Sequence, residues 1–333
     1  MIQLHIATES DIKPFTHLRA GETKLGETLQ LCDSLDDIVN NNCTYVLFGI
    51  CEDIGIRANY GKPGAIKAWG SFVKAFVNVQ DNQFNNGNDI LLLGHIAVSP
   101  DIDDIDKENP ETLGSIVARI DSKVATVVNR IVSAGKIPIV IGGGHNNAYG
   151  NIKGTATALQ KAINVINFDA HTDLRKAEYR HSGNGFTYAL ESENSYLKTY
   201  CIFGLHKNYT PQYIYNMIAT SNHITAFDME DMLLESKQVE NFKTAISQLS
   251  DNTLGIEVDV DSIANFSSSA QTPSGFNLEM MRYFLGQLAR NNKCGYLHIC
   301  EAAPTKKNYQ QVGKALSYLV TDFIRNHREY YTL

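Results

Sequence analysis

No stretch of this 333-residue sequence approaches the roughly 18–20 uninterrupted apolar residues that a membrane-spanning helix needs. Residues 1–5 lack the basic segment and apolar core that begin a secretory signal. No Ser/Gly/Pro-rich linker divides the chain, and no internal repeat is visible. We therefore expect a soluble, cytoplasmic protein in which residues 1–333 form one domain.

An excess of positive charge is also missing. Lys and Arg number 29 against 36 Asp and Glu, which gives a formal net charge of −7. Proteins that hold nucleic acid phosphates carry a basic patch, so we expect neither a nucleic-acid nor a membrane partner. The hydrophobic fraction of 43% and the charged fraction of 20% exclude disorder, collagen and coiled coil, and are typical of a globular enzyme.

Cysteine is sparse and unpaired along the sequence. No two cysteines form a C-x-x-C pair, which argues against a zinc site or a dense disulfide framework. We expect reduced, mostly buried thiols, as in a cytosolic protein. The six residues are Cys32, Cys43, Cys51, Cys201, Cys294 and Cys300.

Short apolar runs alternate with longer segments of helical period. The clearest helical stripe lies within residues 116–132 and is followed by Gly135 as a stop, and a second stripe covers 312–323. This alternation predicts an α/β protein with a mainly parallel sheet and helices on both faces. The acidic segment 101–111 is expected to be a solvated loop that leads into a helix. The predicted strands are 45–50, 90–96, 137–141, 165–168, 200–203, 254–260 and 296–300.

The first segment with chemical character is the apolar run 137–141, which is followed by three glycines and His145. Glycines let the backbone turn tightly after a strand. Such turns often bind phosphate or simply close a loop, and an isolated histidine is more often structural than a ligand. This segment therefore indicates little by itself.

Two further apolar runs end in carboxylates. Asp169, His171 and Asp173 are spaced at i, i+2 and i+4, which places all three on one side of an extended chain. Asp259 and Asp261 share that spacing, and two like charges so close destabilise a fold unless a cation lies between them. The alternatives are a capping Asp in a solvated loop and a polar edge strand.

Together these segments supply two histidines and four aspartates at the predicted carboxyl ends of strands, where open parallel sheets bind ligands. Imidazole with carboxylate suits Mn²⁺ first, while Fe²⁺, Co²⁺, Ni²⁺ or Zn²⁺ also fit. Six side chains exceed the needs of one ion but suit two ions about 3.5–4 Å apart. Two such ions depress the pKa of a water between them, so the sequence predicts metal-assisted hydrolysis.

The three segments, in this order, resemble the ureohydrolase family of arginases, agmatinases and formimidoylglutamases. The family shows a Gly-Gly-x-His turn, then Asp-Ala-His-x-Asp, then Asp-x-Asp. The resemblance implies a three-layer α/β/α sandwich, a pair of Mn²⁺ ions and a homo-oligomer. It implies that His145 and Asp173 hold one ion, that His171 and Asp261 hold the other, and that Asp169 and Asp259 bridge them.

The resemblance also implies a role for Glu301, which follows the last predicted strand. In relatives an acid here contacts the guanidinium or amidinium group of the substrate, since a carboxylate pairs well with a planar cation. Alternatively, Glu301 caps a helix. Asp173 and Glu301 are thus the expected catalytic residues beside the metals.

Departures from arginases narrow the prediction. Arginases carry a proton-transferring histidine shortly after a Ser-Gly-Asn tripeptide, whereas here Phe186 stands in that place after Asn184. His181 precedes the tripeptide and cannot be assigned the role. The third motif also lacks the Asp-Pro common in arginases. These differences count against an arginase and leave the proton donor unassigned.

Residues 55–65 look like the Gly-x-x-x-Asn-x-Gly-Arg-x-Gly-Ala loop of formimidoylglutamases, with Lys62 in place of the arginine. Those enzymes often read Asp-Leu-Arg after the metal motif, as this chain does at 173–175. Their substrate carries two carboxylates and an amidine, so cations must lie near an acidic site. Each of the basic residues in this set could equally be a surface charge. The expected substrate-binding residues are Arg57, Asn59, Lys62, Arg175, Asn184, Lys207 and Glu301.

These observations predict a hydrolase of N-formimidoyl-L-glutamate that releases L-glutamate and formamide. The alternative within the family is a hydrolase of a guanidino compound, of the arginase, agmatinase or guanidinase type. The alternative from another class is a catalytically silent family member, which retention of all six ligand residues disfavours.

Overall fold

The computed structural model describes residues 2–98, 109–291 and 293–331. Within these residues nine strands form one sheet in the order β1-β3-β2-β4-β9-β8-β5-β6-β7. β1 is antiparallel to β3, and every other neighbouring pair is parallel. The strands are β1 (Ile2–Ile6), β2 (Tyr45–Cys51), β3 (Ile90–Val98), β4 (Ile137–Ile141), β5 (Ile163–Phe168), β6 (Leu197–Leu205), β7 (Ile224–Asp228), β8 (Leu254–Asp259) and β9 (Cys294–Cys300).

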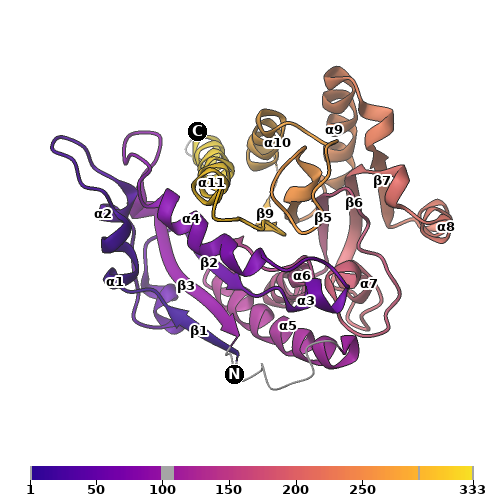
Figure 1. Cartoon of the computed structure of the whole chain (residues 1–333), viewed down its shortest axis with the longest axis horizontal. Coiled ribbons are helices and arrows are strands. Elements are labelled where there is room, and N and C mark those ends of the chain that lie inside the picture. Colours follow the sequence, from indigo (N-terminus) through magenta and orange to yellow (C-terminus); the bar gives the residue numbers. More distant parts are fainter. Residues whose placement is uncertain (1, 99–108, 292, 332–333) are drawn as a thin grey trace.

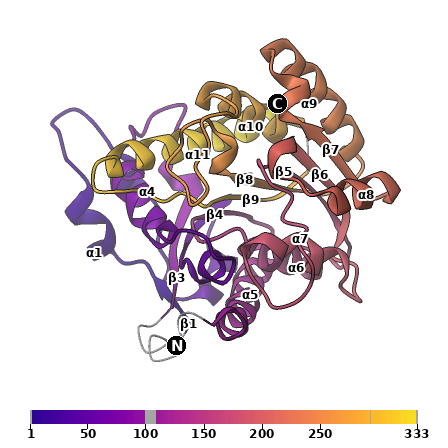
Figure 2. The ribbon, with the colours of Figure 1, turned by 45° about the vertical axis from the view of Figure 1, so that its right-hand side comes forward.

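Helices cover both faces of the sheet, which confirms the predicted three-layer α/β/α sandwich (Figures 1 and 2). One layer contains α4, α9, α10 and α11, and the other contains α5, α6 and α7. The longer helices are α4 (Ala68–Phe76), α5 (Pro110–Ser133), α6 (Asn147–Leu159), α8 (Gln212–Thr220), α9 (Glu235–Leu249), α10 (Leu278–Asn291) and α11 (Tyr309–Tyr331). The short ones are α1 (Glu9–Ile12), α2 (Leu25–Thr28), α3 (Ile54–Ala58) and α7 (Gly185–Leu190).

The alternation of side chains along each strand divides the core into layers. On β2, Tyr45 and Leu47 pack into the cluster that contains α4 and α11, whereas Val46 and Phe48 pack into the cluster that contains α5. Successive side chains on a strand point to opposite faces, so a strand covered on both sides must be apolar throughout. This is why the continuous apolar runs of the sequence correctly predicted buried parallel strands.

All seven predicted strands are present, and β1 and β7 are the two that the sequence reading missed. Both form the edges of the sheet, where one side of a strand has no neighbour and the apolar signal is weak. Residues 101–108 of the expected acidic loop lie outside the described residues. Asn109 caps α5, because its side chain accepts hydrogen bonds from the backbone N–H groups of Glu111 and Thr112.

The four strands that carry the chemical motifs are neighbours, in the order β4-β9-β8-β5 at the centre of the sheet. Their carboxyl ends therefore meet at one place, as the ligand-binding rule for open parallel sheets requires.

All six cysteines are free, and Cys43, Cys201 and Cys300 are buried. Among the described residues, no helix combines the length and apolar character needed to cross a bilayer.

A buried histidine in α11 gives a testable pH dependence of stability. Burial lowers the pKa of His327 to about 4, and its Nδ1 lies 2.8 Å from the Tyr45 hydroxyl. The unfolded chain, with a histidine pKa of about 6.5, binds more protons than the folded chain between pH 6.5 and 4. His327 therefore contributes to stability above pH 6.5, and this contribution is lost as the pH falls toward 4.

We expect His327→Asn, whose amide oxygen can replace Nδ1 as an acceptor, to reduce this loss of stability by about 1 kcal/mol at pH 5. Urea unfolding at pH 7 and pH 5 measures the effect. His17→Asn, at an exposed position, is the control and should leave the pH dependence unchanged. A wild-type pH dependence in His327→Asn would contradict the assignment.

Candidate metal centre and active site

The turn after β4 presents His145. Gly142 and Gly143 have φ values of +91° and +73°, a region that side chains disfavour, and a Cβ on Gly143 would lie 2.4 Å from Nδ2 of Asn147. The buried carboxylate of Glu52, just after β2, braces this turn. Its Oε1 accepts hydrogen bonds from the Gly144 N–H at 3.0 Å and from Asn147 Nδ2 at 2.6 Å. The backbone path that delivers His145 is thus fixed by glycines and by a buried acid.

The end of β5 places one carboxylate between two imidazoles. Oδ2 of Asp169 lies 3.2 Å from Nδ1 of His145, and its Oδ1 lies 3.4 Å from Nδ1 of His171. Asp173 reaches back toward the first imidazole, with Oδ2 2.8 Å from Nδ1 of His145, and its backbone is left-handed at φ +48°. Strained backbone of this kind is often found at functional sites.

The end of β8 completes the arrangement. Oδ2 of Asp259 lies 3.4 Å from Nδ1 of His145, and Oδ2 of Asp261 lies 3.0 Å from Nδ1 of His171. Both carboxyls are buried. The Asp259 side chain also accepts a hydrogen bond from the Asp261 N–H at 2.9 Å, which fixes the short turn after the strand.

The six side chains form two adjacent groups that share Asp169. In each group, the ligand atoms lie within 4.8 Å of one another. The side chains of three motifs that are distant in the sequence lie close together in space. Asp169 belongs to both groups, whereas Asp259, which the resemblance also places between the two ions, belongs to one. One group contains His145, Asp169, Asp173 and Asp259, and the other contains Asp169, His171 and Asp261.

The electrostatics of the cluster fit bound cations. Burial, followed by the charges of Asp261 and Asp169, raises the pKa of Asp259 well above its usual range. Burial alone would lower the pKa of His171, but the charge of Asp261 raises it. Both ring nitrogens of His145 are buried without a hydrogen-bond partner, although three carboxylates face Nδ1. Divalent cations would satisfy this orphaned nitrogen and offset the clustered negative charge.

A second buried acid supports His145 from behind. Oε2 of Glu257 lies 2.6 Å from Nδ1 of His298 and 3.6 Å from Nε2 of His145, and Oε1 accepts a hydrogen bond from the Tyr296 hydroxyl at 2.8 Å. Burial would raise the pKa of Glu257, but the neighbouring His298 and His145 lower it to about 2. The contact with His145 is an ion pair rather than a hydrogen bond, and a buried carboxylate at this place favours one orientation of a metal-binding ring through its charge.

We expect Glu257→Gln to weaken metal binding about 10- to 100-fold, because the amide orients the His145 ring less strongly. Titration of the metal-free protein against a chelator measures the affinity. Glu240→Gln, at a side chain that is 64% exposed, is the matched control and should bind metal normally. An unchanged affinity in Glu257→Gln would rule out this support.

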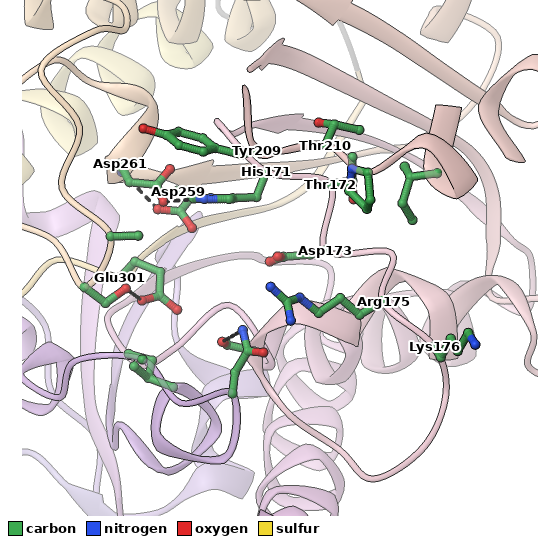
Figure 3. Close-up of a pocket in the computed structure, with 18 of the residues that line it drawn as sticks. His171, Thr172, Asp173, Arg175, Lys176, Tyr209, Thr210, Asp259, Asp261 and Glu301 are labelled. Carbon is green, nitrogen blue, oxygen red and sulfur yellow. Dashed lines mark hydrogen bonds and ion pairs between the residues drawn. The ribbon is translucent and has the colours of Figure 1, made fainter. Parts of the chain in front are cut away.

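A cavity of about 730 Å³ opens beside the cluster (Figure 3). Asp259, Asp261 and Glu301 lie on one side, and Figure 3 shows the Arg175 guanidinium directed toward the pocket beside Asp173. Acidic and basic groups therefore line one space. The other described lining residues include Ile56, Asn59, His171, Thr172, Lys176, Ser182, Tyr209, Thr210, Tyr213, Ile214 and Ser269.

Glu301 follows β9 with a left-handed backbone at φ +63°. Its Oε1 accepts a hydrogen bond from the His145 N–H at 2.8 Å, and its Oε2 accepts one from the Ser269 hydroxyl. Burial raises the pKa of Glu301 to about 8. Glu301 lines the cavity, and neither of these two hydrogen bonds caps a helix. Its contact with a substrate stays a prediction.

The residues expected to bind substrate are divided by the structure. Asn59, Arg175 and Glu301 line the cavity, whereas the other four lie outside its lining. Asn184 is buried, and its side-chain amide donates to the backbone oxygens of residues 176 and 179. Lys207 pairs with Asp231 at 2.6 Å instead. The remaining two are Arg57, on α3, and the exposed Lys62.

Phe186 stands against the first imidazole of the cluster. Its buried ring meets His145 edge-on, with centroids 5.2 Å apart, and stacks on Tyr200 at 4.1 Å. His181 does not line the cavity, and its Nδ1 accepts a hydrogen bond from the Gly183 N–H. Neither residue offers a proton to the cavity, in agreement with the departure from arginases seen in the sequence.

Three residues of the site were missed by sequence reasoning. Glu257 had a usable signal, since it shares the alternation of Asp259 and Asp261. Glu52 follows an apolar strand directly, which is a weaker signal of the same kind. Tyr209, whose ring stacks on His171, belongs to a turn whose sequence gives no such indication.

A mainly parallel sheet with clustered imidazoles and carboxylates at its central strand ends, beside an open cavity, is typical of metal-dependent α/β/α hydrolases. Residues 44–324 match the model of the Arginase family, and the chain belongs to this family. It is a hydrolase that acts on carbon–nitrogen bonds of linear amidines.

Several similar proteins are formimidoylglutamases. The one from Chromobacterium violaceum is 24% identical over 290 residues, covering 85% of this chain and 87% of its own. The Salmonella arizonae protein is 27% identical over 219 residues, or 64% and 63% of the two chains. The Bacillus subtilis formimidoylglutamase structure has a TM-score of 0.77 at 18% identity, covering 97% and 99%. Trypanosoma cruzi formiminoglutamase with Mn²⁺ has a TM-score of 0.72 at 20% identity, covering 92% and 98%.

Proposed function

We propose that this protein hydrolyses N-formimidoyl-L-glutamate to L-glutamate and formamide, with two Mn²⁺ ions bound at the paired cluster. The observation that carries the proposal is the joint lining of one cavity by an acid and a base. Glu301 is suited to an amidinium cation, and Arg175 is suited to a carboxylate. Formimidoylglutamases and a Mn²⁺-containing formiminoglutamase among the similar proteins support the same substrate and metal.

The ions would be held by one group of three residues and one group of four, with Asp169 common to both. Divalent cations at this position supply hydroxide at neutral pH, because they lower the pKa of water, and they polarise the substrate. The buried carboxylates hold such cations in a fixed place. His145, Asp169, His171, Asp173, Asp259 and Asp261 are the proposed ligands.

The chain's own groups would position the substrate. Glu301, held by its two hydrogen bonds, orients the amidinium, and Arg175 with Asn59 receives the glutamate carboxylates at the other side of the cavity. Water adds to the amidine carbon to give a tetrahedral adduct. Collapse of this adduct to formamide breaks the bond between that carbon and the glutamate nitrogen, which must gain a proton as it leaves. Asp173 is one of the carboxylates that line the cavity, and it would take a proton from the adding water and pass it to this nitrogen.

The test is a substrate panel. Mn²⁺-loaded protein is incubated with formimidoylglutamate, arginine, agmatine and guanidine, and formamide, urea and ammonia are measured. We expect formamide from the first compound alone. Urea from arginine or agmatine, without formamide from formimidoylglutamate, would overturn the proposal.

A second candidate is a guanidino-compound hydrolase. The agmatine ureohydrolase of Thermoplasma volcanium has a TM-score of 0.69 at 18% identity, covering 97% and 99% of the chains. Arg175→Ala separates the candidates, because removal of a cavity cation should raise the KM for an anionic substrate and lower it for a basic one. A catalytically silent protein would give no product from any compound and fewer than one ion per chain after Mn²⁺ reconstitution.

We also propose that the protein is a homo-oligomer and is located in the cytoplasm. Ureohydrolases commonly assemble from identical subunits, and the sequence resemblance is the support for such an assembly here. Light scattering of the purified protein tests the oligomer: a mass near 37.0 kDa would contradict it.

A further inference from the structure

A column of three rings covers one side of the candidate metal cluster. The Tyr209 ring lies 5.2 Å from the His171 ring at an interplanar angle of 23°, and 5.4 Å from the His206 ring at 3°. His206 is buried, while Tyr209 is 47% exposed and lines the cavity. Figure 3 shows Tyr209 beside His171 and above Asp259 and Asp261. An exposed tyrosine is thus in stacking contact with a proposed metal ligand.

The turn that presents Tyr209 is anchored on both sides. The His206 N–H donates to the Ala170 carbonyl at 3.0 Å, which joins the turn to the segment carrying His171. The Lys207 N–H donates to both oxygens of Glu230, at 3.1 and 3.2 Å. The position of the Tyr209 ring relative to His171 is therefore set by the backbone.

The two imidazoles of the cluster differ in how they are supported. The His145 side chain is 1% exposed and is enclosed by Phe186 and Glu257, whereas the His171 side chain is 32% exposed. Tyr209 is the aromatic ring that packs on His171 among the described residues. Removal of this contact would leave one face of the imidazole to solvent and allow the ring to turn away from Asp261.

We infer that Tyr209 is a positioning residue for the second metal ion: its ring holds the His171 imidazole with Nδ1 facing Asp261 and Asp169. The inference rests on the two-ion site of the proposed function. It concerns the ring and not the hydroxyl, because stacking is the contact that Tyr209 makes with His171. Aromatic pairs contribute about 0.5–1.5 kcal/mol beyond area burial, which corresponds to as much as about tenfold in affinity.

The experiment compares metal binding by Tyr209→Ala, Tyr209→Phe and Tyr213→Ala. Tyr213 is a matched control, since it also lines the cavity and is 44% exposed. Chelator-treated protein is titrated with Mn²⁺, and free Mn²⁺ is followed by electron paramagnetic resonance. We expect Tyr209→Ala to bind the second ion about tenfold more weakly with the first unchanged. Tyr209→Phe and Tyr213→Ala should bind both ions as the wild type does.

Three outcomes would overturn the inference: equal weakening of both ions, the same loss in Tyr213→Ala, or unchanged Mn²⁺ binding by Tyr209→Ala with a raised KM. The last result would make Tyr209 a substrate contact. Thermal unfolding checks each variant, and Tyr209→Leu, which keeps apolar bulk but no ring, replaces an unstable Tyr209→Ala and should show the same selective loss. If the protein binds two Mn²⁺ ions but releases no formamide, the proposed substrate is refuted and the inference about Tyr209 is not, because Mn²⁺ binding is measured without turnover.

Discussion

Asp169→Asn should reduce turnover by about 10³-fold or more and should lower the bound Mn²⁺ from two ions per chain to one or none. The two oxygens of Asp169 face different imidazoles, at 3.2 Å from His145 and 3.4 Å from His171. An amide keeps one oxygen but replaces the other with an NH₂ group that cannot bind a cation. Loss of a Lewis acid worth several kcal/mol gives the expected change in rate.

Asp36→Asn makes the same chemical change at a side chain that is 77% exposed and paired with Arg130, and it should leave metal content and turnover unchanged. Metal analysis by mass spectrometry and the formamide assay measure both variants. Two tightly bound ions in Asp169→Asn would show that this carboxylate does not bridge, and the two-group description of the site would then be wrong.

The central strands of the sheet could be predicted from the sequence, whereas its two edge strands could not. The predicted strand 137–141 has the same bounds as β4, because a strand covered on both faces must be apolar along its whole length. β1 and β7 were missed because an edge strand needs less apolar surface. The convergence of the aspartates and histidines could be predicted, since the carboxyl ends of parallel strands share one edge of the sheet.

The contacts of the groups around the ligands could not be predicted, because their partners are distant in the chain. Glu52 hydrogen-bonds to Gly144, 92 positions away, and no local pattern shows this pairing. The same limit applies to the basic residues that were predicted to bind substrate. Arg175 and Lys207 are both basic residues that follow buried strands, β5 and β6, yet one lines the cavity and the other pairs with Asp231. The charge of a side chain does not predict the group with which it pairs in the folded chain.

Glu301→Gln should lower kcat/KM for formimidoylglutamate about 10²- to 10³-fold while leaving two ions bound. The carboxyl lines the cavity, and burial raises its pKa to about 8, so it gains from a cationic partner more than an exposed acid would. Glutamine preserves the shape and can still accept a hydrogen bond, but it removes the charge that pairs with the amidinium. Loss of a desolvated charge pair costs about 2–5 kcal/mol.

Metal content separates two ways in which Glu301 could act. Its Oε1 accepts a hydrogen bond from the His145 N–H at 2.8 Å, so the residue touches both the substrate cavity and the loop that carries a ligand. Glu301→Asp retains the charge on a shorter side chain and should recover part of the lost rate if the charge acts on the substrate. A fall in bound Mn²⁺ in Glu301→Gln would instead assign Glu301 to the support of His145. Normal Mn²⁺ content with a raised KM in Glu301→Gln would show that the carboxylate contacts the amidinium directly. In that case substrate binding is weakened while the metal ligands are unchanged.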